Sequence, residues 1–145
     1  PGFDDQVYDA HQRFFIDELP AWAETELGVP TNPANRGVWG CSDGGGHAAT
    51  VARLFAPRFG HAFVYSTGMP PDMAYNWTDI HPFMHLCAGT LEGPFHQATE
   101  AWAGYLMLVD APYHFTERVA GHDLVQWAEE LPYAINRAWG TDSNS

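Results

Sequence analysis

A serine in a glycine-rich turn is the residue of this sequence best placed to do chemistry. Residues 40–44 read Gly-Cys-Ser-Asp-Gly, a G-x-S-x-G pattern, and two more glycines follow directly. The apolar run 37–41 is typical of a buried strand, and the apolar spacing over 47–56 predicts a helix. A serine on such a strand-to-helix turn holds its hydroxyl exposed above the sheet. We therefore predict that Ser42 is a nucleophile.

The neighbours of Ser42 have the types that such a turn requires. Gly40 and Gly44 lie two positions before and after it, where larger side chains are expected to collide. The start of the helix adds a positive partial charge, and the backbone N–H of Asp43 is expected to point at a developing oxyanion. A phosphate-binding loop is one alternative, but the sequence lacks both the lysine of a P-loop and the G-x-G-x-x-G spacing. A plain tight turn is the other alternative.

A serine hydroxyl needs a base to activate it, and the base needs an acid to orient it. His122 follows the last predicted strand and is the candidate base. Glu92 follows the third predicted strand and is the candidate acid, which gives the chain order serine, acid, histidine. Three other carboxylates are alternatives as the acid: Asp123, which suits a helix N-cap better, Glu117, inside a strand, and Asp110, at the opposite end of one.

Alternating helices and strands must position these residues. Apolar spacing predicts helices over 8–27, 47–56, 94–109 and 124–135, and strands over 37–41, 61–66, 82–88 and 113–119. Pro20 is expected to kink the first helix or to begin a second segment. This order is typical of an α/β fold with an open, mostly parallel sheet flanked by helices. Ligands bind such sheets at the carboxyl ends of the strands, which Ser42, Glu92 and His122 all follow.

Composition bounds the class of protein. The chain has 145 residues, 46% of them hydrophobic, which suits one domain with a packed core. Six arginines and no lysine face 18 acidic residues, for a formal net charge of −12, which argues against binding to nucleic acid or to an anionic membrane surface. No apolar run approaches the ~20 residues of a membrane span. No leader segment is recognisable, so a location in the cytoplasm is the default expectation.

The remaining reactive side chains have a structural interpretation. Cys41 and Cys87 lie in apolar strand-like runs and are interpreted as buried thiols. No metal-binding spacing such as H-E-x-x-H is present, so neither a metal site nor a cofactor is expected from the four histidines that invite one, His81, His85, His96 and His114.

The loop after the second predicted strand is rich in large apolar side chains. Met69, Tyr75 and Trp77 belong to it, and the loop leaves the sheet on the side that carries the candidate nucleophile. These three residues are candidates for an apolar substrate pocket, with packing in the core as the alternative.

In combination these motifs resemble an esterase family that includes the enterochelin esterases, esterase D and the feruloyl esterases. The resemblance runs from about residue 14 to about residue 139 and rests on six segments: 18–20, 40–45, 57–60, 66–68, 88–92 and 121–123. It implies the α/β-hydrolase fold and ester hydrolysis by a serine, an acid and a histidine. By this resemblance Ser42 is the nucleophile, Glu92 the acid and His122 the base, and Asp43 supplies one N–H of an oxyanion hole.

The sequence departs from the family on its amino-terminal side. The family's fold has further strands there, which carry a second oxyanion donor, and nothing in this sequence corresponds to them. The chain therefore resembles the carboxyl-terminal half of a hydrolase domain. We expect a carboxylic ester hydrolase that acts on a small-molecule ester. The alternatives are an acyltransferase of the same fold, or a non-catalytic half-domain that needs self-association, a partner chain or a missing amino-terminal half.

Overall fold

A computed structural model of the chain describes residues 5–73 and 80–140. It divides into two compact units, Pro1–Asn32 and Pro33–Ser145, which we describe separately. Within the described residues, no helix combines the length and the apolar character that crossing a membrane requires.

The first unit is a helical segment that a proline interrupts. Helix α1 (Asp5–Arg13) passes into a π-helical turn, η1 (Phe14–Glu18), and then into α2 (Leu19–Glu26). Pro20 lies in the first turn of α2, where its missing N–H is harmless. The wider π turn directly before it gives room to a ring that would press on the preceding turn of a regular α-helix. The interruption predicted at Pro20 therefore takes the form of a π-helical turn.

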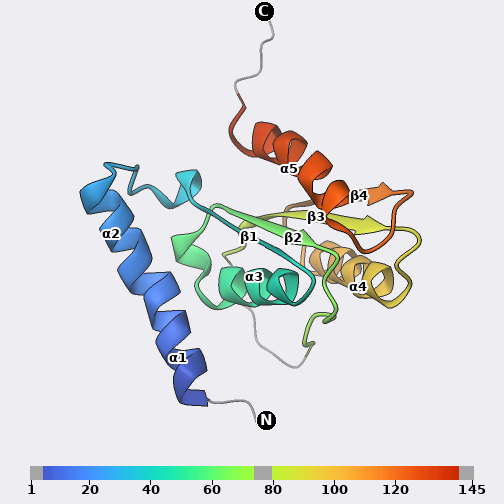
Figure 1. The fold of residues 1–145 in the computed structure, drawn as a ribbon, viewed down its shortest axis with the longest axis horizontal. Coiled ribbons are helices and arrows are strands. Elements are labelled where there is room, and N and C mark those ends of the chain that lie inside the picture. Colours follow the sequence, from blue (N-terminus) through green and yellow to red (C-terminus); the bar gives the residue numbers. More distant parts are fainter. Residues whose placement is uncertain (1–4, 74–79, 141–145) are drawn as a thin grey trace, which may run out of the picture. The chain divides into compact units, whose positions relative to one another are not determined.

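The second unit contains a parallel sheet. Its strands are β1 (Gly37–Cys41), β2 (His61–Tyr65), β3 (Phe83–Gly89) and β4 (Tyr113–Arg118). They lie side by side in the order of the sequence, and every neighbouring pair is parallel (Figure 1). These strands match the four predicted ones to within a residue. All four carboxyl ends therefore meet at one edge of the sheet, as the sequence predicted.

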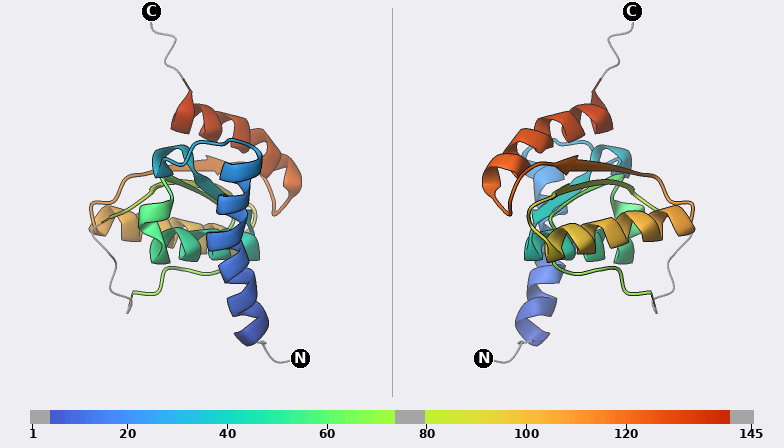
Figure 2. Two further views of the ribbon diagram at one scale, coloured as in Figure 1. Left: turned by 90° about the vertical axis from the view of Figure 1, so that its left-hand side faces the viewer. Right: turned by 90° about the vertical axis from the view of Figure 1, so that its right-hand side faces the viewer.

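Helices cover both faces of this sheet. Helices α3 (Asp43–Leu54) and α4 (Pro94–Leu108) lie on one face, and α5 (Leu124–Trp139) lies on the other (Figure 2). Helix α3 begins four residues before the predicted start, because its first turn includes three consecutive glycines that carry no apolar signal. Helix α5 continues past Pro132 to Trp139, four residues beyond the predicted end.

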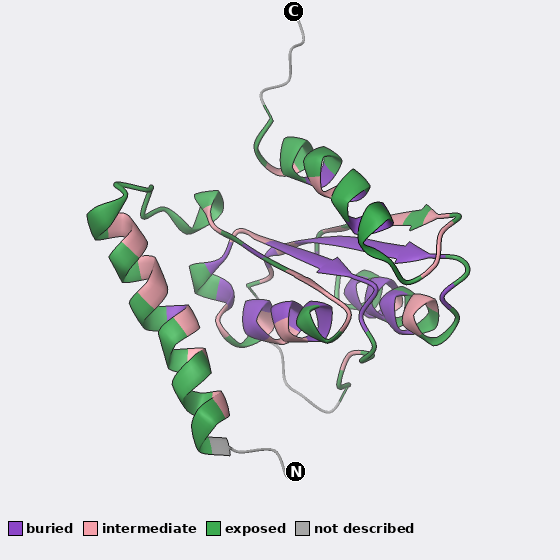
Figure 3. Ribbon diagram, in the orientation of Figure 1, coloured by how far each residue is buried: buried purple, intermediate pink, exposed green. Residues whose placement is uncertain are grey.

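The core lies around the two central strands. Strands β2 and β3 are buried almost throughout (Figure 3). Beneath α5 they contribute Phe63, Tyr65 and Cys87 to a cluster with Trp127 and Ala134. The outer strands are more exposed to solvent, as predicted for β4. Strand β1 has one strand partner among the described residues, β2, and its Trp39 is 48% exposed.

The buried face of α5 includes Trp127, as its apolar spacing predicts, but differs from the predicted apolar face at other positions. Leu124 is 73% exposed and Ile135 is 43% exposed, although both belong to the apolar pattern. Gln126 and Glu130 are buried instead. Both polar side chains have partners in the sheet layer or its loops, so hydrogen bonding allows them to be buried on the same face as Trp127 and Ala134.

Candidate active site

Ser42 occupies the turn between β1 and α3 in a conformation that few non-glycine residues adopt. Its φ and ψ are 57° and −127°. Its N–H donates to the carbonyl of Tyr65 at 3.0 Å, which continues the sheet. Its own carbonyl accepts from Gly45 at 2.9 Å and from Gly46 at 3.2 Å, which begins the helix. The backbone on both sides thus holds Ser42 at the carboxyl edge of the sheet, in a strained geometry that is typical of functional positions.

The glycines around Ser42 are not equivalent. A Cβ on Gly40 would lie 1.9 Å from the carbonyl oxygen of Gly44, so only glycine fits there. A Cβ on Gly44 would meet nothing within 4 Å, contrary to the steric requirement that we predicted at this position. The requirement falls on Gly45 instead, where a Cβ would lie 2.7 Å from the carbonyl oxygen of Tyr65. The backbone carbonyl of Gly44 makes the close approach to Gly40, whereas a Cβ on Gly44 would point into open space.

The structure brings Ser42, His122 and Glu92 into one chain of hydrogen bonds. The Nε2 atom of His122 lies 2.9 Å from Ser42 Oγ. Its Nδ1 atom lies 2.6 Å from Glu92 Oε2. The three residues come from three different loops, which follow β1, β3 and β4 at the same edge of the sheet. This arrangement can move a proton from a hydroxyl to an imidazole while a carboxylate balances the resulting charge.

Glu92 is buried and surrounded by donors. Its side chain has no exposed surface. The Oε1 atom accepts from Ser66 Oγ at 2.6 Å, from Gln126 Nε2 at 3.2 Å and from the backbone N–H of Gly89. Burial alone disfavours a carboxylate anion, but three donors on one oxygen favour it. The other oxygen, Oε2, is left to His122.

Two aromatic rings hold the imidazole of His122. Phe95 stacks on it with ring centroids 3.8 Å apart, and Trp127 meets it edge-on at 5.0 Å. The His122 side chain is still 28% exposed. The ring is therefore fixed between α4 and α5 while it stays accessible from solvent.

The alternative acids have other partners. Asp123 caps α5, where its Oδ1 accepts from the N–H groups of Val125 and Gln126, as predicted. Glu117 pairs with His96 at 2.7 Å. Asp110 precedes β4 and so lies at the amino end of that strand.

The predicted oxyanion donor lies at the start of α3. Asp43 is the first residue of this helix, and the N–H groups of a first helical turn have no acceptor within the helix. This N–H is therefore free of intrahelical bonding at the position next to Ser42.

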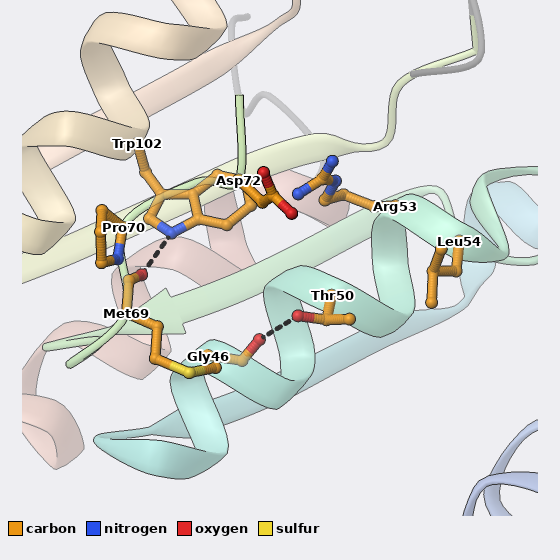
Figure 4. Close-up of a pocket in the computed structure, with 8 residues that line it drawn as sticks. All are labelled: Gly46, Thr50, Arg53, Leu54, Met69, Pro70, Asp72 and Trp102. Carbon is orange, nitrogen blue, oxygen red and sulfur yellow. Dashed lines mark hydrogen bonds between the residues drawn. The ribbon is translucent and has the colours of Figure 1, made fainter. Parts of the chain in front are cut away.

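The structure tests only part of the predicted substrate pocket. Tyr75 and Trp77 lie outside the described residues. Met69 lines a cavity of about 300 Å³ beside α3 and α4 (Figure 4), whose other lining residues are Gly46, Thr50, Arg53, Leu54, Pro70, Asp72 and Trp102. Ser42, Glu92 and His122 are not among them. The carbonyl of Met69 accepts from Trp102 Nε1 at 2.8 Å, which ties this residue to α4.

The cysteines and histidines of the described residues show no second reactive centre. Burial raises the pKa of the Cys41 thiol to about 11. Burial, with a smaller effect of nearby charges, raises the pKa of the Cys87 thiol to about 12, so both thiols stay protonated at neutral pH. Within the part of the chain that the structure describes, no three His, Cys, Asp or Glu side chains are grouped as metal ligands would be.

Sequence reasoning missed the donors around Glu92. Ser66, Gln126 and Trp127 come together here, from the end of β2 and from the first turn of α5. The one available signal was the Ser66 hydroxyl, at the end of the predicted strand 61–66 and in one of the segments that carry the resemblance, 66–68. Helical position gave no signal for Gln126, because a polar residue in a first turn normally faces water.

Comparison with known proteins places this fold. No known family profile matches the chain, and no curated protein matches it. A ferulic acid esterase from Anaeromyces mucronatus, solved in complex with ferulic acid, superposes with a TM-score of 0.76 at 15% identity, over 97% of this chain and 59% of its own. An S-formylglutathione hydrolase from Staphylococcus aureus gives 0.76 at 17% identity, over 91% and 62%. The enterochelin esterase from Shigella flexneri gives 0.73 at 19% identity, over 85% and 35%.

These likenesses show that the chain has an α/β-hydrolase fold. The sheet of parallel strands flanked by helices on both faces is the part of that fold which this chain contains. The chain spans about 60% of the length of similar structures such as a ferulic acid esterase and the S-formylglutathione hydrolase.

Proposed function

We propose that this chain carries the catalytic centre of a carboxylic ester hydrolase. The observation that supports this most directly is the continuous hydrogen-bond chain from Ser42 Oγ through His122 to the buried carboxylate of Glu92. The fold shared with esterases agrees with it. The substrate class is a small-molecule ester of a modest-sized acid or alcohol.

The first half of the reaction acylates Ser42. His122 carries its proton on Nδ1, which donates to Glu92, so Nε2 is free to accept. Ser42 Oγ attacks the carbonyl carbon of the ester and gives its proton to Nε2. The carbonyl oxygen becomes an oxyanion, which the N–H of Asp43 stabilises. The C–O bond to the alcohol then breaks, the alcohol takes the proton from His122, and the acyl group stays on Ser42.

The second half releases the acid. A water molecule gives a proton to His122 Nε2 and attacks the acyl carbon. The bond to Ser42 Oγ breaks, Oγ regains the proton, and the carboxylic acid leaves. Glu92 stays ionised throughout and balances the charge of the imidazolium in both steps.

The open edge of β1 favours one second candidate, a half-domain that acts only with a further segment. Among the described residues this strand pairs on one side only, and Trp39 on it is 48% exposed. A further segment there could supply a second oxyanion donor, whose absence costs about 10²–10³ in rate. The two candidates differ in whether the isolated chain is reactive.

Intact-mass analysis after treatment with a fluorophosphonate tests both candidates. We expect one covalent adduct on the chain and none on Ser42→Ala. Thr116→Val, which removes a hydroxyl that donates to Glu130 and not to the three site residues, is the control and should label like the parent. An adduct that persists in Ser42→Ala contradicts the proposal. A folded chain that forms no adduct contradicts activity of the chain by itself and favours the half-domain. The rates of hydrolysis of p-nitrophenyl acetate and methyl ferulate then show whether the site prefers an ester of a small aliphatic acid or of an aromatic acid.

A further inference from the structure

Ser66 lies beside Ser42 at the carboxyl edge of the sheet. It follows β2 directly, and the last residues of β1 and β2, Cys41 and Tyr65, are register partners. Ser66 is completely buried and has a φ of 48°. Ser42 and Ser66 are thus two neighbouring non-glycine residues in the left-handed region. Such strain persists only where the surroundings hold it in place, and it is concentrated at functional positions.

The hydrogen bonds of Ser66 determine where its single proton points. The indole N–H of Trp127 lies 2.8 Å from Ser66 Oγ, and an indole nitrogen can only donate. The amide nitrogen of Gln126 lies 3.4 Å from the same oxygen, but its two protons have closer acceptors in Glu92 Oε1 and the carbonyl of Gly121. Because the indole N–H can only donate and a carboxylate oxygen can only accept, the Ser66 hydroxyl accepts from Trp127 and donates to Glu92 Oε1, 2.6 Å away.

The same amide nitrogen fixes the arrangement from the other side. Gln126 Nε2 also donates to Glu92 Oε1 at 3.2 Å and to the carbonyl of Gly121, next to His122. The loop that carries the imidazole and the carboxylate that faces it are therefore linked through one buried side chain.

We propose that Ser66 is a positioning residue for the acid, and that Trp127 aims its hydroxyl. By keeping Oε1 of Glu92 occupied, Ser66 leaves Oε2 as the oxygen that faces His122. This inference rests on the proposed function, in which Ser42, His122 and Glu92 perform the reaction. Ser66 does not touch the reacting atoms and exchanges no proton with them.

The length of the acid explains why such a residue is needed. A glutamate has one more rotatable bond than an aspartate, so its carboxylate can occupy more positions relative to a fixed imidazole. Donors on Oε1 select one of them. They also satisfy the hydrogen-bonding capacity of a carboxylate oxygen in a site without exposed surface.

Three variants test this inference. Ser66→Ala removes the donor. Trp127→Phe keeps an aromatic ring against His122 and removes the N–H that aims the hydroxyl, together with part of a ring packed in the core, so it tests the inference even where Ser66→Ala fails to fold. Thr116→Val is the matched control, because Thr116 donates to a different buried carboxylate, Glu130, at 3.0 Å.

Two readouts separate positioning from stability. With an activated ester, we expect Ser66→Ala to lower kcat about tenfold with KM nearly unchanged, as expected for losing one hydrogen bond to a charged group. Trp127→Phe should lower kcat about threefold, because the bond it removes is to a neutral hydroxyl. Thr116→Val should leave both kcat and KM unchanged.

Proton NMR of the free protein provides a readout that needs no turnover. The downfield resonance of the His122 N–H that faces Glu92 should shift or broaden in Ser66→Ala and Trp127→Phe, and stay in place in Thr116→Val. Folded variants with the parent resonance and the parent kcat would overturn the positioning role. If the parent chain hydrolyses no ester, but the His122 resonance still shifts in Ser66→Ala and Trp127→Phe, the proposed function is refuted. The role of Ser66 in holding Glu92 is then still supported.

Discussion

Replacing Glu92 by glutamine tests how the imidazole of His122 is held. Both carboxylate oxygens of Glu92 accept hydrogen bonds. Oε2 faces His122 Nδ1 at 2.6 Å. Oε1 faces three donors, which are Ser66 Oγ, Gln126 Nε2 and the N–H of Gly89. The variant Glu92→Gln keeps the shape of this side chain and replaces one of the two acceptors by a donor.

The donors around Oε1 decide which way the new amide turns. The amide oxygen takes the place of Oε1, because three donors meet there, and the NH₂ group then faces Nδ1. Nδ1 of His122 must accept, so the ring proton moves to Nε2. In this tautomer Nε2 cannot take the proton of Ser42. The wrong tautomer costs about 10⁴-fold in kcat in a serine protease with the same arrangement, which is about 5 kcal/mol.

The assay is the rate of fluorophosphonate labelling together with kcat for an activated ester. Glu130→Gln is the matched control, because Glu130 is also a buried carboxylate and is paired with Arg118 at 3.1 Å, away from His122. We expect the control to lose stability and to keep its rate per folded molecule. A Glu92→Gln variant that is folded and reacts within tenfold of the parent would refute the tautomer argument.

Two further predictions concern the turn and the acid sensitivity of the fold. Gly40→Ala should lower the free energy of unfolding in urea titrations by at least about 1–3 kcal/mol, because the new Cβ meets the Gly44 carbonyl. Gly44→Ala should raise the free energy of unfolding by up to about 1 kcal/mol, because alanine favours the helix and its Cβ meets nothing. Equal effects of the two variants would contradict the geometry of the turn. Burial, and to a smaller extent nearby cations, lowers the pKa of His85 from 6.5 to about 3. The neutral His85 therefore contributes its full stability above pH 6.5. This contribution is lost as the pH falls toward 3, at about 1.4 kcal/mol per pH unit. His85→Phe should flatten that slope, and an unchanged slope would assign the acid sensitivity to other groups.

Most of the fold could be predicted because its signals are local. The four strands and the helices α3, α4 and α5 follow from apolar runs and helical spacing within a few residues. Boundaries were missed where that signal fails, as at the glycines that begin α3 and beyond Pro132 in α5. The buried face of α5 was predicted only in part: Trp127 is buried as its apolar spacing indicates, but Gln126 and Glu130 are buried by hydrogen bonding, which no apolar pattern records.

The sequence by itself determined where the reactive side chains lie. A parallel α/β order sends every loop after a strand to the same edge, so Ser42, Glu92 and His122 could be placed there from their positions alone. The sequence also specified the turn at Ser42, since Gly40 permits a close approach of the backbone that follows from short-range sterics.

Only the tertiary structure decided how Glu92 is held and which glycine after Ser42 is required. Ser66 is 26 residues from Glu92 in sequence, and Gln126 is 34 residues away. Their approach depends on the register of β2 beside β3 and on the way α5 packs over the sheet. The need for glycine at Gly45 likewise comes from the carbonyl of Tyr65, on the neighbouring strand. Short-range sterics can be read along the chain, whereas burial and hydrogen-bond partners arise between segments whose separation only packing sets.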